Sequence, residues 1–161
     1  SGPTAPPAAT NTASGSCSVP EPDRLRAAMP EGRFTVTTTA RREMIDLTDQ
    51  VAQAVATAGL EDGICVLYNP HTTAGLTINE GADPDVRHDL LGALERLVPR
   101  EYPYRHAEGN SPAHLMTLLP GSCATVIVHR GRLRLGTWQR IFLCEYDGPR
   151  TRTVWWQVLA G

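Results

Sequence analysis

The chain of 161 residues contains no lysine, and all fifteen of its basic residues are arginine. This absence excludes mechanisms in which a lysine amine acts as a nucleophile or forms a Schiff base. The arginines are balanced by 17 acidic residues, and no basic run reaches the length of a nucleic-acid-binding patch. We therefore expect no nucleic-acid partner for this protein.

Long hydrophobic runs are also missing. The longest, around residues 124–128, is far shorter than the roughly 18 residues that a membrane-spanning helix needs. The N-terminus lacks the charged segment followed by an apolar one that marks a secretory signal. The four cysteines show neither CxxC spacing nor the density of a disulfide scaffold. These absences predict a cytoplasmic protein with no membrane partner and with reduced cysteines.

Proline and aromatic residues are unevenly distributed along the chain. Residues 1–30 hold six of the 13 prolines and none of the nine aromatic residues. Such a composition cannot bury enough apolar surface to fold. We expect a disordered or extended N-terminal tail over residues 1–32, followed by one domain over residues 33–161.

The hydrophobic pattern of the domain predicts several strands and two main helices. The first helix has Thr48 as its N-cap and Gly59 at its C-terminal end. The second has Asp83 as its N-cap and Pro84 in its first turn, and it ends before Pro99. Its apolar stripe consists of Val86, Leu90, Leu94, Leu97 and Val98.

The remaining apolar runs alternate as strands do. The expected strands are residues 33–40, 63–68, 124–129, 140–146 and 151–159, with 76–79 as a continuation or partner of the second. The order of strands and helices indicates a mixed α+β fold with mostly antiparallel pairing.

Polar residues that can form a site gather in two segments, residues 71–80 and 106–114. If the first is extended, His71, Thr73, Thr77 and Asn79 share one surface, while the residues between them enter the core. The alternative is a solvent-facing strand of threonine and asparagine beside a hydrogen-bonded histidine.

The second segment holds two further histidines. Ser111 begins a helix by capping logic, so that His114 falls in its first turn, and His106 lies upstream in a loop. Together with His71, these side chains could form a three-histidine face with an open coordination position for a divalent metal, zinc or magnesium. Glu108 could orient such a ligand or act as a base. The alternative is that these histidines only cap or pack.

Three further positions have local interpretations. Glu145 lies in an apolar run, where a carboxylate needs a partner, and Arg150 or Arg152 is the nearest candidate. Trp155 and Trp156 point to opposite faces of one strand, so we expect one inside the domain and the other at a subunit contact.

The motifs at residues 71–90, 106–115 and 131–154 resemble those of the secondary thiamine-phosphate synthase family, also called the YjbQ-like family. The resemblance covers the chain from about residue 33 to its end. It implies a compact α+β domain with an antiparallel β-sandwich-like core, assembled as a homotrimer with polar clefts near the subunit interfaces. It also implies a transferase that joins a hydroxymethylpyrimidine diphosphate to a thiazole phosphate.

The resemblance, together with the chemistry of the residues themselves, implies three groups of site residues. The expected metal ligands are His71, His106 and His114. The expected catalytic residues are Glu80, Glu108, Asn79 and Asn110. The expected contacts to a phosphorylated small-molecule substrate are Thr72, Thr73, Arg87, Arg105, Trp138 and Gln139.

Three functions are compatible with these groups. In the transferase, a divalent cation and Arg87 or Arg105 would help the diphosphate to leave, while Trp138 stacks on the pyrimidine. In a metal-dependent hydrolase, the three histidines would hold a metal-bound water, with Glu108 or Glu80 as its base. The third is a trimeric metal-binding or small-molecule-binding protein without turnover.

Overall fold

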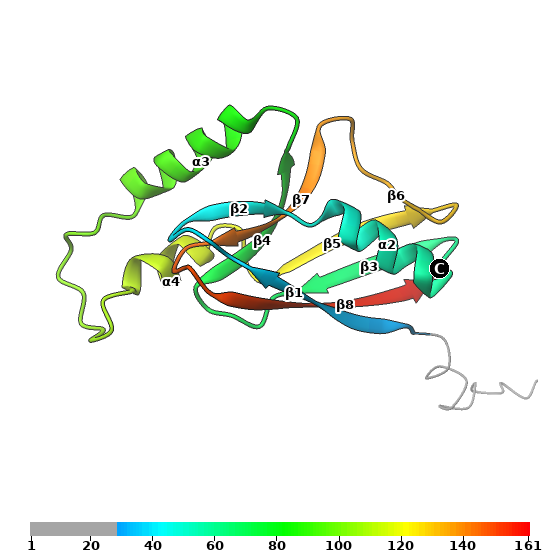
Figure 1. Cartoon of the computed structure of the whole chain (residues 1–161), viewed down its shortest axis with the longest axis horizontal. Helices are drawn as coiled ribbons and strands as arrows, with labels where there is room; N and C mark the ends of the chain where they lie inside the picture. Colours follow the sequence, from blue (N-terminus) through cyan, green and yellow to red (C-terminus); the bar gives the residue numbers. More distant parts are fainter. Residues whose placement is uncertain (1–28) are drawn as a thin grey trace, which may run out of the picture.

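The computed structural model describes residues 29–161, which form two antiparallel sheets and three helices (Figure 1). Residues 1–28 of the expected tail lie outside the described residues. The larger sheet has the order β1-β8-β3-β5-β6, with strands Glu31–Thr37, Thr151–Ala160, Gly63–Tyr68, Cys123–His129 and Arg132–Leu133. The smaller has the order β2-β7-β4, with strands Glu43–Asp46, Gln139–Glu145 and Ala74–Glu80.

The main hydrophobic core lies on one face of the larger sheet. Side chains alternate along each strand, so Cys65 and Leu67 of β3 are buried beside Val154 and Val158 of β8. Leu76 and Leu143 of the smaller sheet, together with Val51 and Val55 of the first helix, belong to the same cluster. The fold is therefore the expected α+β arrangement with antiparallel sheets, and the smaller sheet and one helix cover one face of the larger.

The first helix, α2 (Thr48–Ala58), begins differently from the prediction. Its N-cap is Leu47, which makes no side-chain capping bond, and Thr48 is already helical. The Thr48 hydroxyl instead accepts a hydrogen bond from the backbone N–H of Ile141 at 2.9 Å. The expected cap is wrong because this hydroxyl joins α2 to β7. Gly59 ends the helix in the left-handed conformation, as predicted.

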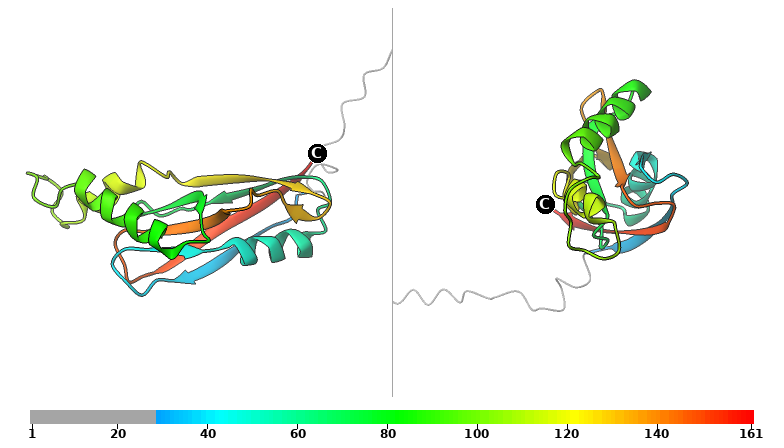
Figure 2. Two further views of the ribbon diagram at one scale, coloured as in Figure 1. Left: turned by 90° about the horizontal axis from the view of Figure 1, so that it is seen from above. Right: turned by 90° about the vertical axis from the view of Figure 1, so that its left-hand side faces the viewer.

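The second helix, α3 (Pro84–Leu97), begins as predicted, with the Asp83 carboxylate accepting from the N–H of Asp85 at 2.9 Å. Its apolar stripe is only half covered. Leu90, Leu91 and Leu94 pack against a second, smaller core around Phe142, but Leu97 is 71% exposed. In Figures 1 and 2, α3 stands at one side of the sheets.

A third, short helix, α4 (Ser111–Thr117), follows the loop of residues 98–110. This loop and α4 lie at the end of the molecule opposite the C-terminus (Figure 2). No helix in residues 29–161 combines the length and the apolar character needed to cross a membrane.

Candidate functional site

The loop that precedes β4 is shaped by Asn69, a fully buried residue. Its side-chain oxygen accepts from the N–H of His71 at 3.1 Å, and its amide donates to the carbonyls of His71 and Ala74. The loop therefore turns before the strand begins at Ala74. The prediction that His71 and Thr73 continue the strand is wrong, because these two residues belong to the turn.

A buried ion pair lies beneath this loop. The Arg152 guanidinium donates to the two carboxylate oxygens of Glu145 at 2.7 and 2.5 Å, which confirms one of the two partners predicted for this residue. Arg152 also donates to the hydroxyl of Thr73, and the hydroxyl of Thr38 donates to Glu145. The side chains of Glu145 and Arg152 are only 0% and 5% exposed, so this network is a structural anchor closed to ligands.

The second predicted partner, Arg150, pairs instead with Asp147 at 2.8 Å. Asn110 donates to the same carboxylate at 3.1 Å, which ties the start of α4 to the turn after β7. Burial raises the pKa of Asp147, but the hydrogen bonds from Asn110 and Arg150 outweigh it and lower the pKa overall.

His71 lies directly above the ion pair. Its Nε2 accepts a hydrogen bond from the backbone N–H of Thr153 at 2.8 Å, so the ring proton of neutral His71 is on Nδ1. Burial and the positive charge of Arg152 lower the pKa of His71, while the Glu145 carboxylate opposes them. His71 is therefore held in its neutral form, with one nitrogen already used.

His114 of α4 is fixed by the same loop. Its Nδ1 lies 3.1 Å from the carbonyl oxygen of Thr72, and a carbonyl can only accept. Nδ1 therefore carries a proton, and in the neutral ring Nε2 has a lone pair. The ring of His106 packs edge-on against His114 at 5.5 Å between centroids, and the Glu108 carboxylate lies 3.7 Å from Nε2 of His106.

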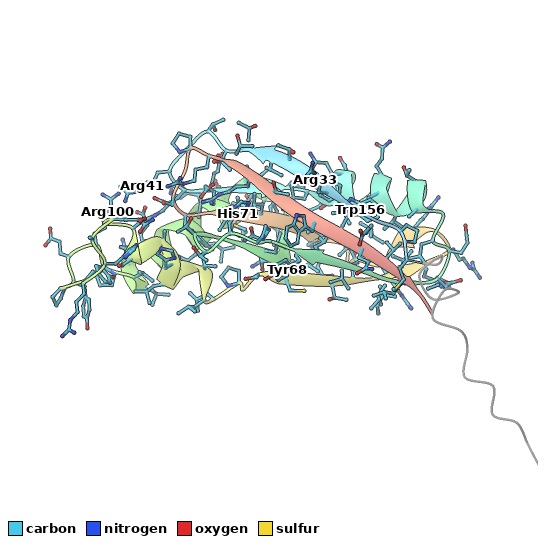
Figure 3. The ribbon with its side chains drawn as sticks, turned by 90° about the horizontal axis from the view of Figure 1, so that it is seen from below. Arg33, Arg41, Tyr68, His71, Arg100 and Trp156 are labelled. Carbon is cyan, nitrogen blue, oxygen red and sulfur yellow. The ribbon has the colours of Figure 1, made fainter. Side chains whose placement is uncertain are left out.

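Two cavities meet at His114. One, of about 310 Å³, is lined by residues that include Tyr68, His71 and Thr72; Tyr68 and His71 are labelled in Figure 3. The other, of about 440 Å³, is lined by residues that include His106, Ser111 and two tyrosines. Folding thus places the three predicted histidines along one continuous surface, and we call the second cavity the histidine cleft. Its lining residues are Tyr102, Tyr104, His106, Ser111, His114 and Leu115.

The residues do not fit the expected divalent metal. Residues 29–161 contain no group of three or more histidine, cysteine, aspartate or glutamate side chains that could hold a metal ion. The Thr153 N–H already occupies Nε2 of His71, so this ring does not offer that nitrogen to a metal. We therefore derive no chemistry through a metal.

A second group of predicted site residues lies at the far end of β4, about 20 Å from the histidine cleft by the rise of a seven-residue strand. There, Asn79 accepts from the N–H of Glu80, and Glu80 accepts from the N–H groups of Ala82 and Asp83. Trp138 is 64% exposed and lines a hollow with Glu80.

Two more predicted contacts are found near that end. Gln139 pairs with Glu80 across the sheet and accepts from the N–H of Gly136, and Arg87 lies over the Phe142 ring. Arg105 is exposed in the loop beside His106. The structure thus separates the predicted set into two groups that cannot contact one small molecule.

Three residues of the site have no local sequence signal. Tyr102 and Tyr104 lie in a loop without periodicity, and Asn69 directly follows the strand predicted over residues 63–68. The described cysteines add no nucleophile at this cleft: burial raises the pKa of Cys65 to about 11 and that of Cys144 to about 12, and Cys123 is exposed on β5. Cys17 lies outside the described residues.

Known proteins that resemble this chain in sequence and in fold identify its family. A family model described as UPF0047 protein YjbQ-like matches residues 32–161. The chain belongs to the UPF0047, or YjbQ-like, family. It is 48% identical over 125 residues to the YugU protein of Bacillus subtilis, covering 77% of this chain and 95% of that protein. It is 43% identical over 127 residues to a UPF0047 protein of Methanocaldococcus jannaschii, covering 79% and 92%.

Solved structures of YjbQ-like proteins share the fold. A crystal structure from Clostridium acetobutylicum is 44% identical, with a TM-score of 0.78, and the match covers 80% of this chain and 99% of that one. A second, from Sulfolobus solfataricus, is 32% identical, with a TM-score of 0.79 and coverage of 83% and 98%. The α+β architecture predicted from the sequence is thereby confirmed.

The expected activity is not supported by these YjbQ-like relatives. They are named as UPF0047 proteins, and the Sulfolobus structure is described as a protein of unknown function. The prediction of a thiamine-phosphate synthase is therefore wrong, and so is the metal-dependent hydrolase, because the described residues form no metal site. The metal-binding part of the third alternative falls with the same observation.

Proposed function

We propose that this YjbQ-like protein binds the acidic head group of a small phosphorylated molecule in the histidine cleft, where Nε2 of His114 accepts the proton of a P–OH group and then donates it in a hydrogen bond to the phosphate. The observation that carries the proposal is the 3.1 Å contact between Nδ1 of His114 and the Thr72 carbonyl. A histidine whose tautomer is fixed by one hydrogen bond has its other nitrogen free to accept a proton from a ligand.

The composition of the cleft supports an acidic ligand. Its six lining residues include two imidazoles, one serine hydroxyl and two tyrosines, but no carboxylate. Arg105, next to His106 in the same loop, adds a positive charge at the surface. Phosphate oxygens accept hydrogen bonds from a hydroxyl and from an imidazole N–H. The Glu108 carboxylate lies outside the lining, 3.7 Å from Nε2 of His106.

The test is a titration of the protein with methyl phosphate, observed through the histidine ring nitrogens by NMR. We expect free His114 to carry its proton on Nδ1, and the signals of His106 and His114 to move as methyl phosphate binds. His114→Asn keeps a donor for the Thr72 carbonyl but removes the second nitrogen, so it should weaken binding at least tenfold. His88→Gln, on the exposed side of α3, is the matched control and should bind normally.

Two results would overturn the proposal. One is that methyl phosphate moves no histidine signal. The other is that His114→Asn binds methyl phosphate as tightly as the unmodified protein, which would show that Nε2 takes no part.

We also infer that the protein is a homotrimer in which the outer face of the larger sheet is covered. Ile64, Tyr68, Ile127 and Trp155 on this face are between 36% and 54% exposed, and the rings of Tyr68 and Trp155 stack at 5.8 Å. Large exposed apolar patches mark interaction surfaces. Tyr68 also lines the cavity of His71, so the histidines lie at the edge of this face.

A further inference from the structure

An apolar groove lies between the end of α3, the loop of residues 98–110 and α4. Its volume is about 650 Å³. Leu97, Leu118 and Leu119 line it and are 71%, 76% and 64% exposed. Three leucines that are this exposed to water form an apolar surface, which favours an apolar occupant.

The two tyrosines of the groove strengthen its apolar character. The hydroxyl of Tyr104 donates to the carbonyl of Pro99 at 2.7 Å, so this side chain has its polar atom satisfied within the loop. The rings of Tyr102 and Tyr104 pack at 5.0 Å between centroids, which fixes their faces beside the leucines. The eight lining residues include no charged side chain.

The groove continues into the histidine cleft. Tyr102, Tyr104 and Leu115 line both cavities. Leu118 lies four positions after His114, so the two side chains lie on one side of the α4 segment. A molecule with its head group at His114 therefore has the groove as its nearest apolar surface.

From this continuity we propose that the ligand of the histidine cleft is an amphiphile, a phosphate ester whose hydrocarbon chain lies in the groove. The inference rests on the function proposed above and adds the substrate class. The volume of the groove is in the range of small-molecule pockets. The lining of the groove contains no charged side chain, whereas a protein–protein interface is surrounded by a polar rim.

The experiment measures the binding of methyl, butyl and octyl phosphate by calorimetry, with each phosphate below its micelle concentration. Each methylene that leaves water strengthens binding by up to about fourfold. We expect octyl phosphate to bind at least tenfold more tightly than butyl phosphate. Leu118→Ser should reduce this chain-length dependence and leave methyl phosphate binding unchanged. Trp138→Ser, which removes an exposed apolar side chain elsewhere, is the control and should leave both unchanged.

The outcomes separate the two proposals. If methyl phosphate binds through His114 but all three phosphates bind equally, the amphiphile is wrong and the histidine cleft stands. If none binds, the function proposed for the cleft is wrong. If Leu118→Ser lowers the mass of the assembled protein and leaves the chain-length dependence intact, the groove is a contact between copies, and the amphiphile is again wrong.

Discussion

At the scale of single residues, Glu145 and Arg152 are the charges on which the site rests. Burial raises the pKa of Glu145, but the hydrogen bonds from Arg152, Asp147 and Thr38 and the charge of Arg152 outweigh it, so the pKa is lowered overall. The ion pair orients Thr73 on one side and adjoins His71 on the other. The carboxylate therefore acts on the site through the loop, without contact to a ligand.

Removing one partner should be costly, because the other charge is left buried. We expect Glu145→Gln to lower the free energy of unfolding by about 3–5 kcal/mol, the usual cost of breaking a buried ion pair. Arg152→Gln should have a similar effect, and the double variant should lose less than the sum of the two. Urea unfolding at pH 7 measures all three. Additive losses would show that the two charges do not interact.

The lowered pKa of His71 predicts that the stability of the protein depends on pH. Because its pKa is lower in the folded protein than the ordinary value of 6.5, the unfolded chain binds more protons between the two values. The contribution of His71 is therefore complete above about pH 6.5, and it is lost as the pH falls through the folded-state pKa.

This dependence can be isolated with His71→Gln, which retains an acceptor for the N–H of Thr153 but does not titrate. Urea unfolding between pH 5 and pH 7.5 should show a free energy of unfolding that rises with pH more steeply in the unmodified protein than in the variant. Equal slopes would assign the pH dependence to other groups.

At the scale of elements, the histidine cleft depends on the contact between β4 and the turn after α4. The N–H of Leu76 donates to the carbonyl of Gly121 at 3.0 Å, and a Cβ added at Gly75 would lie 2.5 Å from Cγ of Pro120. Only glycine allows this approach, which holds α4 and its histidine against β4.

Two alanine substitutions test this contact. Gly75→Ala should lower the free energy of unfolding by about 1–3 kcal/mol because the added methyl group collides with the turn. Gly92→Ala, in α3, meets no atom within 4 Å and should raise it by about 0.5–1 kcal/mol, as helix propensity predicts. Thermal unfolding of both variants compares them. A Gly75→Ala protein as stable as the unmodified one would show that the turn can move.

Elements with local signals were predictable, and long-range contacts were not. Asp83 and Pro84 predicted the start of α3 because capping involves only neighbouring residues. Thr48 also has capping chemistry, but its hydroxyl bonds to Ile141, 93 positions away. The same limit explains the site: the motifs indicated three histidines on one surface, but only the fold shows that Glu80 and Trp138 lie at the other end of β4.

At the scale of the whole molecule, the exposed face of the larger sheet predicts assembly. Trp156 packs inward near Phe34, whereas Trp155, at the preceding position, is 49% exposed. This agrees with the expected alternation of side chains along the strand. The function proposed for the histidine cleft places a ligand near this face, because Tyr68 of the face lines the cavity of His71, which meets the cleft at His114.

Light scattering tests the assembly. We expect a mass three times the 17.5 kDa of one chain, and a lower mass for Trp155→Ser combined with Ile127→Ser. Trp138→Ser, which removes an exposed tryptophan that does not belong to the larger sheet, is the control and should leave the mass unchanged. A monomeric unmodified protein would refute the homotrimer.

The half-covered helix α3 has a consequence for the dynamics of the chain. None of its fourteen residues is buried, whereas β7 has five consecutive buried residues from Ile141 to Glu145. Opening α3 therefore exposes little new apolar surface, and its amide hydrogens should exchange with deuterated solvent far sooner than those of β7. Since the apolar groove begins at the end of this helix, an occupant that contacts Leu97 would slow that exchange, which makes α3 an internal reporter of binding.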